Sequence, residues 1–286
     1  MKIIDSHHHL WKHSHQEYGW MDDSMSLLKK DYLPEDLEPE LLAAGVRGTI
    51  VVQARQSLEE TRWLLELAEK HSFIKGVVGW FDLRSPYLVQ QLKDFAAHPK
   101  LVGARHVIHD EADDDFMLRS DFKTGIVYLG AYGFCYDLLL FPRHLEHAVK
   151  LVRSLPRQRF VLDHMGKPLI KTGELEPWKQ DIARLAEYPN VWCKLSGMVT
   201  EADWKEWTYE DLLPYLETVL KEFGPHRVML GSDWPVCRLA GEYSQVMKLV
   251  PDFIASLNKA DQARILYTNA IDCYQLNLET DGEAKD

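Results

Sequence analysis

Short apolar runs rich in β-branched residues alternate with amphipathic stretches along almost the whole chain. Eight such runs can be counted, at Lys2–His9, Val46–Gln53, Ile74–Asp82, Leu101–Ile108, Phe134–Leu140, Phe160–His164, Val191–Ser196 and Arg227–Asp233. Runs that are apolar throughout are typical of strands buried on both faces of a parallel sheet. Eight such strands separated by helices predict an α/β protein with a (β/α)8 TIM barrel rather than an open doubly wound sheet.

Local signals support helices between the runs. Ser57 to Glu60 reads as a capping box that opens a helix to about His71, and Pro177 suits the first position of another helix. The chain contains no G-x-G-x-x-G turn and no P-loop, which weakens a nucleotide-binding alternative.

The length of 286 residues suits one barrel, which we place at residues 1–276. The polar, acidic segment 277–286 is expected to fray. Between the first two predicted strands, Trp11–Leu42 forms a long connection that carries several aromatic residues. Long loops in compact domains are usually functional or disordered, and the aromatic residues favour a functional loop.

Composition excludes several classes of partner. A formal net charge of −11 argues against a nucleic-acid-binding or anionic-membrane-binding surface.

The N-terminus carries Asp5 and three histidines, so it does not read as a signal peptide, and no apolar run is long enough to span a bilayer. The widely spaced cysteines at 135, 193, 237 and 273 read as buried free thiols of a cytoplasmic protein.

Polar residues gather where the predicted strands end. The first strand ends in His7-His8-His9, and later strands offer Gln53, Arg105, His106, Asp137, His164, Lys194 and Asp233. Barrel enzymes carry their chemistry at the carboxyl ends of the strands. Charged groups beside apolar runs are costly to bury unless they are paired or used, so this collection predicts an active site.

The most specific element is His7-x-His9. Residues two apart in a strand point to the same side, so both imidazoles should face the barrel axis and be able to share one metal ion, while His8 points away. Three histidines in a polar loop, or the remnant of a tag, are the alternatives. The preceding β-branched strand and Asp5 argue against both.

His164 and Asp233 complete the predicted cluster. A lone histidine is often only a satisfied core residue, and Asp233 could instead begin an Asp-x-Pro turn. Their positions at two different strand ends favour the site. Lys194 stands inside an apolar run, where lysine is rarely buried without a partner, and this favours a catalytic role. The face that Asp137 occupies stays open.

Five ordered blocks carry a family resemblance: Ile4–Trp11, Asp31–Leu37, Gly103–His106, Val161–Pro168 and Gly231–Pro235. Together they resemble the sugar-lactone hydrolase branch of the amidohydrolase superfamily, with L-fuconolactone and L-rhamnonolactone hydrolases as the nearest types and 2-pyrone-4,6-dicarboxylate hydrolase more distant. The resemblance spans about Met1 to Leu276 and implies a barrel enzyme that hydrolyses the ester bond of a small ring.

The resemblance also implies a site. His7, His9, His164 and Asp233 match the family positions, with His7, His9 and Asp233 as metal ligands. The binuclear members of the superfamily use a bridging residue and histidines on the middle strands, whereas the fifth run here has Asp137 and no histidine. We therefore expect at most one divalent ion, with zinc favoured. Metal-free catalysis stays open, because some relatives in this branch work without a metal.

The hypothesis for function is hydrolysis of an aldonolactone by an activated water. Asp233 is the expected base, and His164 and Lys194 are expected to stabilise the oxyanion. The expected substrate-binding residues are Trp11, Gln53, Arg105, His106 and Trp234. Two alternatives stay open: a metal-dependent decarboxylase on a related barrel, which would release carbon dioxide, and a sugar-acid-binding protein without turnover. The specific lactone and the oligomeric state are open as well.

Overall fold

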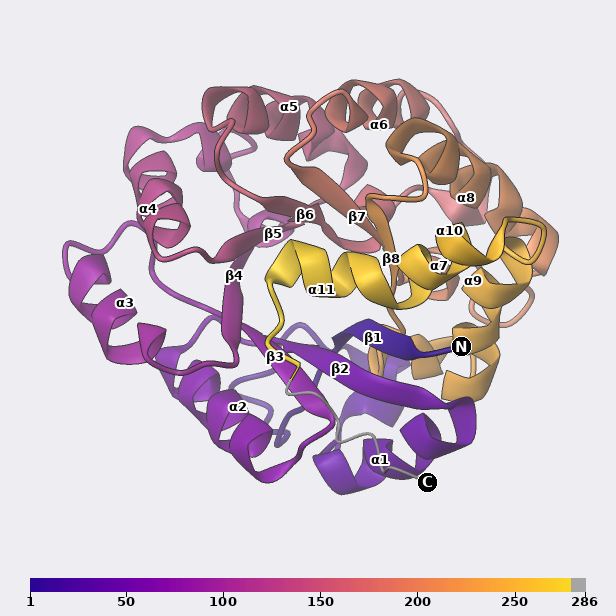
Figure 1. The fold of residues 1–286 in the computed structure, drawn as a ribbon, viewed down its shortest axis with the longest axis horizontal. Coiled ribbons are helices and arrows are strands. Elements are labelled where there is room, and N and C mark those ends of the chain that lie inside the picture. Colours follow the sequence, from indigo (N-terminus) through magenta and orange to yellow (C-terminus); the bar gives the residue numbers. More distant parts are fainter. Residues whose placement is uncertain (279–286) are drawn as a thin grey trace.

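Eight parallel strands follow one another in chain order around a barrel in the computed structural model, which describes residues 1–278 (Figure 1). They are β1 (Ile3–His8), β2 (Val46–Val52), β3 (Ile74–Gly79), β4 (Leu101–Val107), β5 (Cys135–Leu139), β6 (Phe160–Leu162), β7 (Val191–Leu195) and β8 (Val228–Leu230). The ring closes just beyond β8, where His8 forms a parallel bridge with Trp234. The predicted (β/α)8 TIM barrel is confirmed.

Most of the helices surround the barrel and cover the outer faces of its strands, while the last one, α11, lies across one end (Figure 1). The helices are α1 (Pro34–Ala44), α2 (Leu58–Lys70), α3 (Leu88–Ala96), α4 (Ser120–Ala131), α5 (Leu145–Ser154), α6 (Trp178–Ala186), α7 (Met198–Glu201), α8 (Tyr209–Phe223), α9 (Tyr243–Phe253), α10 (Lys259–Ala263) and α11 (Asn269–Tyr274). Ser57 caps α2 as predicted, with its hydroxyl accepting from the Glu60 N–H at 3.2 Å. Pro177 stands one residue before α6 rather than at its first position.

Several predicted strands extend too far at their carboxyl ends. β6 stops at Leu162 and β8 at Leu230, short of His164 and Asp233. The reason is local: φ is +53° at His164 and +60° at Asp233, and this left-handed backbone cannot continue an extended strand. The site residues therefore stand in tight turns just beyond the strands.

Two apolar cores hold the barrel together. One lies between the strands and the surrounding helices. The other fills the barrel interior with side chains from the strands, including Ile4, Ile50, Val78 and Val161, and from α11, including Tyr274. In Figure 1, α11 lies across the barrel opening, so the last helix closes one end of the interior core.

The long connection after β1 is ordered. It contains the short helix η1 (Asp23–Leu28) and leads into α1, and Trp11 and Tyr32 exchange two backbone hydrogen bonds of 2.9 Å. All four cysteines are free and buried, as predicted. No helix within residues 1–278 is both long and apolar enough to cross a membrane. Most of the segment 277–286, for which fraying is expected, lies outside the described residues.

Gly125 in α4 offers a test of the packing between the helical layer and the loop after β3. A Cβ at this position would lie 2.1 Å from the Leu83 carbonyl oxygen. Replacing glycine by alanine inside a helix normally gains about 1 kcal/mol. Here the forced backbone shift should outweigh that gain, so Gly125→Ala should lower the free energy of unfolding by about 1–3 kcal/mol in urea titration.

Gly19→Ala is the control, because no atom lies within 4 Å of the added Cβ. Its unfolding free energy should stay within about 0.5 kcal/mol of the wild-type value. A Gly125→Ala protein that is more stable than the wild type would show that α4 is not held against Leu83.

Candidate active site

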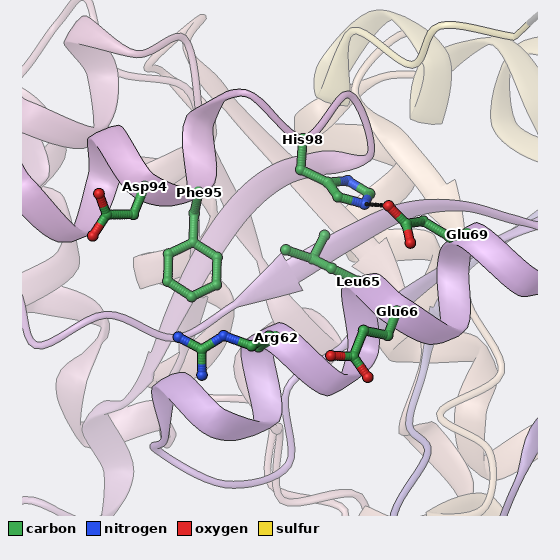
Figure 2. A pocket seen from close by; sticks show the side chains of 7 residues that line it. All are labelled: Arg62, Leu65, Glu66, Glu69, Asp94, Phe95 and His98. Carbon is green, nitrogen blue, oxygen red and sulfur yellow. Dashed lines mark ion pairs between the residues drawn. The ribbon is translucent and has the colours of Figure 1, made fainter.

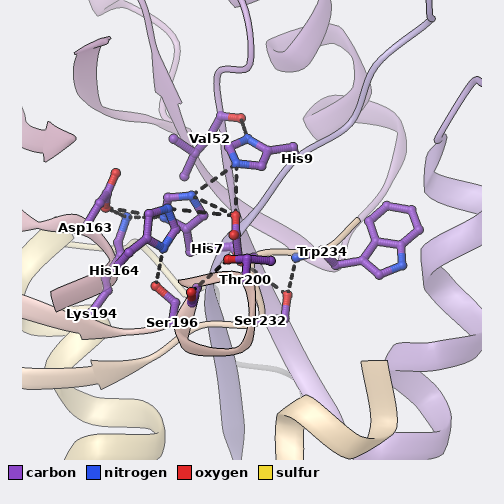
Figure 3. Close-up of polar contacts among 12 residues, drawn as sticks. His7, His9, Val52, Asp163, His164, Lys194, Ser196, Thr200, Ser232 and Trp234 are labelled. Atoms are coloured by element: carbon purple, nitrogen blue, oxygen red, sulfur yellow. Dashed lines mark hydrogen bonds and ion pairs between the residues drawn. The ribbon is translucent and has the colours of Figure 1, made fainter. Parts of the chain in front are cut away.

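His7 near the end of β1 and His9 just beyond the strand point to the same side, into the barrel mouth (Figure 3). Their Nε2 atoms lie 3.2 Å apart. Nδ1 of His9 lies 2.8 Å from the Val52 carbonyl oxygen, which can only accept, so Nδ1 of His9 carries a proton. His8 points the other way, with Nε2 2.9 Å from Thr49 Oγ1. The predicted separation of His8 from the cluster is confirmed.

His164 joins them from the turn after β6, with its ring centroid 4.4 Å from that of His7. Its Nδ1 lies 2.9 Å from Ser196 Oγ. Burial lowers the pKa of His164 to about 4, although Asp233 acts in the opposite direction, so the ring is neutral at pH 7. Gly197 makes room for this ring, because a Cβ there would lie 2.6 Å from His164 Nδ1.

Asp233 faces all three imidazoles. Its Oδ1 lies 3.4 Å from Nε2 of His9 and 3.8 Å from Nε2 of both His7 and His164. Burial alone would raise the pKa of this carboxyl, but His164 and His9 outweigh it and hold the pKa below its usual value. The predicted convergence of these four residues is therefore confirmed, with an ionised carboxylate among the rings.

A second layer of charged side chains lies beneath His7. Asp163 Oδ1 is 3.3 Å and Lys194 Nζ is 3.2 Å from Nδ1 of His7. Arg105 Nη1 lies 3.3 Å from Nε2 of His7 and 3.0 Å from Asp163 Oδ2. Lys194 also pairs with Asp163 Oδ1 at 3.0 Å and with Asp137 Oδ2 at 2.6 Å.

These pairings decide the charge states of the second layer. Burial would raise the pKa of Asp163, but Lys194 and His7 hold it well below its usual value. The two carboxylates raise the pKa of Lys194 despite the burial that opposes them. Burial raises the pKa of Asp137 to about 6, although Lys194 opposes the rise. Lys194, expected at the oxyanion, is fully buried below His7, with its Nζ 3.2 Å from Nδ1 of that ring.

Gln53 and Arg105 lie beside the cluster and are tied to each other, whereas His106, the residue after Arg105 in β4, points to the opposite face and packs on Phe116 and Phe122. Gln53 Nε2 donates to the Arg105 carbonyl oxygen at 3.2 Å, and an Arg105 Nη2–H donates to the Gln53 carbonyl oxygen. His106 accepts from Trp80 Nε1 at 3.3 Å and lies 2.7 Å from Glu111 Oε1. The Gln53 Oε1 and Arg105 Nε atoms are buried and have no hydrogen-bond partner within residues 1–278.

The two expected tryptophans are packed. Trp11 is fully buried, with its ring centroid 6.4 Å from that of His9, and its Nε1 donates to the Lys30 carbonyl oxygen. Trp234 is also buried, packs edge-on against Tyr32 and points away from the histidines (Figure 3). The geometry places Trp11 beside the site and gives Trp234 a packing role.

Sequence reasoning left three positioning residues without a role: Asp163, Ser196 and Asp5. Asp5 is fully buried and accepts from His7 N at 3.1 Å, Ser232 N at 2.8 Å and Ser232 Oγ at 2.6 Å. Asp5 and Asp163 could have been identified from the sequence, because each is a carboxylate within or directly after an apolar run. Ser196 carried no comparable signal.

The donor atoms fit a divalent ion such as zinc. His7, His164 and Asp233 each offer a ligand atom, and these atoms lie within 4.8 Å of one another. The ligand set predicted from the sequence contains His9 instead of His164. Nε2 of His9 lies 3.2 Å from Nε2 of His7, so His9 offers a further donor atom. Ligand atoms around tetrahedral zinc lie roughly 3.3–3.5 Å apart, given bonds of about 2.0–2.1 Å. Neutral imidazoles and a carboxylate are the usual partners of this ion.

A separate surface pocket lies in the helical layer between α2 and α3 (Figure 2). Arg62, Glu66 and Glu69 line it from α2, and Glu69 pairs with His98 at 3.3 Å. None of the predicted site residues lines this pocket, so it stands apart from the barrel mouth.

Comparisons with known proteins agree with the fold. The chain is 39% identical over 284 residues to an L-fucono-1,5-lactonase of Burkholderia multivorans, covering 96% of both chains. It is 40% identical over 243 residues to an L-fucono-1,5-lactonase of Burkholderia ambifaria, covering 84% of this chain and 82% of the relative. The crystal structure of an amidohydrolase from Burkholderia multivorans with bound zinc superposes with a TM-score of 0.94 at 38% identity, covering 97% of this chain and 100% of that one.

The family model described as amidohydrolase matches residues 4–276, which include every member of the histidine–aspartate cluster. This match spans the barrel from β1 to the end of α11. The chain therefore belongs to the amidohydrolase family.

Proposed function

We propose that this protein hydrolyses a sugar lactone, with L-fucono-1,5-lactone as the first substrate to test, to the open acid. The observation that carries the proposal is the convergence of ionised Asp233 with His7, His9 and His164 at the barrel mouth. Identity of 39% over almost the whole chain to an L-fucono-1,5-lactonase supports the substrate class.

Asp233 is the proposed base. Hydrolysis of an ester requires a water that loses a proton as it attacks the carbonyl carbon. The lowered pKa of Asp233 keeps its carboxylate ionised at neutral pH and able to accept that proton. The same carboxylate can return the proton to the ring oxygen as the ester bond breaks, which yields the free hydroxyl and the acid.

His164 is the proposed stabiliser of the oxyanion. If the Ser196 hydroxyl donates to Nδ1 of the neutral ring, the proton of His164 stands on Nε2, which faces Asp233 at 3.8 Å. A donor fixed in this way stabilises negative charge that develops on the carbonyl oxygen. Lys194 supports the cluster from below through Asp163, whose Oδ1 lies 3.0 Å from Lys194 Nζ and 3.3 Å from Nδ1 of His7.

In the other tautomer, with the proton of His164 on Nδ1, the three residues His7, His164 and Asp233, with His9 beside them, would hold a single divalent ion, zinc being the best match to these donors. When bound, such an ion polarises a carbonyl and lowers the pKa of a bound water. Arg105 approaches His7 Nε2 to 3.3 Å and competes for the same lone pair, an observation that favours metal-free catalysis. Chelation therefore belongs in the first assay.

Gln53 and Arg105 are proposed to bind hydroxyl groups of the sugar. Gln53 Oε1 is an acceptor and Arg105 Nε–H a donor, and both are buried without a partner among the described residues. An unpaired buried polar group costs about 1–3 kcal/mol, which a ligand hydroxyl would recover. Trp11, whose ring centroid lies 6.4 Å from that of His9, is the proposed aromatic neighbour of the sugar. His106 does not share this role, because it packs against Phe116 and Phe122 on the opposite face of β4.

The proposed function is tested by a pH-drop screen of aldonolactones with the purified protein, with and without a chelator. Acid release from L-fucono- or L-rhamnonolactone is the expected result. Release of carbon dioxide from aromatic acids without lactone turnover would favour the decarboxylase alternative, and tight binding of sugar acids without any turnover would favour the binding protein.

Asp233→Asn tests the base. The change is nearly isosteric and removes the proton acceptor, so kcat should fall by about 10²–10⁴-fold while KM stays close to the wild-type value. Asp203→Asn is the matched control, because Asp203 is an exposed partner of Lys171 outside the site. Wild-type kcat in Asp233→Asn would show that the water is activated elsewhere.

Gly197→Ala tests whether the position of His164 matters. Its methyl group would lie 2.6 Å from His164 Nδ1, so the ring must move and kcat should fall by about 10²-fold, the scale of a misplaced catalytic group. Gly173→Ala is the control: φ is +70° there, close to +64° at Gly197, but no atom lies within 4 Å of the added Cβ. Equal losses of kcat in the two variants would attribute the effect to backbone strain alone.

The pH profile tests the charge state of the cluster. Because the pKa of His164 is lowered to about 4 and that of Asp233 lies below its usual value, both groups keep their neutral-pH forms down to about pH 5. A plot of kcat/KM against pH should therefore be flat from pH 8 to pH 6 and fall only at lower pH. A decrease centred near pH 6.5 would indicate an ordinary, exposed histidine in the mechanism.

A further inference from the structure

The last helix of the described chain reaches into the charged interior of the barrel. Tyr274, at the end of α11, is 2% exposed, and its hydroxyl donates to Asp137 Oδ2 at 2.7 Å. Lys194 Nζ lies 5.4 Å from the centre of the Tyr274 ring. A residue near the C-terminus thus contacts the charged layer that lies below His7.

The carboxylate of Asp137 is held through one oxygen. Both Tyr274 Oη and Lys194 Nζ contact Oδ2, at 2.7 and 2.6 Å. Oδ1 is buried and has no hydrogen-bond partner within residues 1–278. The torsion that turns an aspartate carboxylate is broad and roughly two-fold, so a single contact fixes it weakly. The hydroxyl of Tyr274 is the second contact that keeps Oδ2 directed at Lys194.

Lys194 connects Asp137 to the histidine cluster. Its Nζ lies 2.6 Å from Asp137 Oδ2 and 3.2 Å from His7 Nδ1. On the far side of the same ring, Nε2 of His7 faces His9 at 3.2 Å and Asp233 at 3.8 Å. From Tyr274 to His7, every link is 3.2 Å or shorter.

We propose that Tyr274 is a positioning residue for the reaction, because it fixes Asp137, which holds Lys194 against His7. The inference rests on the proposed function for its kinetic consequence only. Outer-layer partners of a ligating histidine typically contribute 10–100-fold to activity. If Tyr274 had only a packing role in the interior core, loss of its hydroxyl would leave the His7 ring unaffected.

Tyr274→Phe removes the hydroxyl and keeps the ring, so it tests the proposal with the full-length protein. The expected result is a fall in kcat of about tenfold with KM unchanged, since Tyr274 acts through His7 and lies remote from the substrate side. The two-bond ¹H–¹⁵N spectrum of the imidazoles gives a second readout that needs no turnover. The His7 signals, assigned by their absence in His7→Asn, should shift in Tyr274→Phe.

Tyr215→Phe is the matched control. Tyr215 in α8 is 1% exposed, and its hydroxyl donates to the carbonyl oxygens of Leu169 at 3.3 Å and Glu174 at 3.2 Å, outside the barrel interior. This variant should lose stability to a similar extent and keep both kcat and the His7 signals. Wild-type kcat in Tyr274→Phe, unmoved His7 signals, or an equal kcat loss in Tyr215→Phe would each overturn the proposal.

Two further results separate the inference from the proposed function. If the wild-type protein hydrolyses no lactone, the proposed function is wrong. The imidazole signals of His7 in Tyr274→Phe then test the role of Tyr274 without any activity measurement. If Tyr274→Phe does not fold, Asp137→Asn replaces it, since this change keeps the packing of Tyr274 and weakens the hold on Lys194. Shifted His7 signals in Asp137→Asn support the contacts that run from Asp137 through Lys194 to His7. Unshifted signals overturn the proposal.

Discussion

The buried ion pairs beneath His7 are the interaction on which both the interior and the site depend. They join two acids and two bases: Asp137, Asp163, Arg105 and Lys194. A single ion in such a place costs several kcal/mol, and removal of one partner from a buried pair typically costs about 3–5 kcal/mol. Because the charges balance, the barrel tolerates them, and because they surround one imidazole, their arrangement also orients the site. Stability and function therefore share the same side chains.

Backbone strain is concentrated in the two turns that carry His164 and Asp233, which hold four of the five non-glycine residues with positive φ within residues 1–278. His164 and Asp233 both adopt positive φ, a conformation that costs a residue with a side chain about 1–3 kcal/mol. One tertiary and one local hydrogen bond hold these turns in place: Asp233 N donates to the His7 carbonyl oxygen at 2.8 Å, and Lys167 N closes its own turn by donating to the His164 carbonyl oxygen at 2.8 Å. The strained turns direct a carboxylate and an imidazole towards the same point, which an extended strand end would not do.

Elements from the beginning and from the end of the described chain contact one another around this site. Asp5 on β1 ties the first strand to Ser232 and, through a contact of 3.2 Å, to Tyr243 of α9. Burial raises the pKa of Asp5 to about 6 against the hydrogen bonds that oppose the rise. α11 then closes the interior and places Tyr274 on Asp137. Closure of the barrel and the geometry of the site depend on shared contacts, because Asp5, Ser232 and His7 join the first strand to the turn that carries Asp233.

The sequence by itself determined the alternation of buried strands with helices, and with it the barrel, since the pattern of apolar runs is a local property. It also placed His7 and His9 on one side of β1 and His8 on the other, because that follows from the two-residue period of a strand. The convergence of His164 and Asp233 could be expected only through the assumption of a barrel. Tertiary structure alone decided the left-handed turns at these residues, the place of Lys194 below His7 rather than at the oxyanion, and the packing of Trp234. Such features depend on contacts between residues more than a hundred positions apart, which no local pattern encodes.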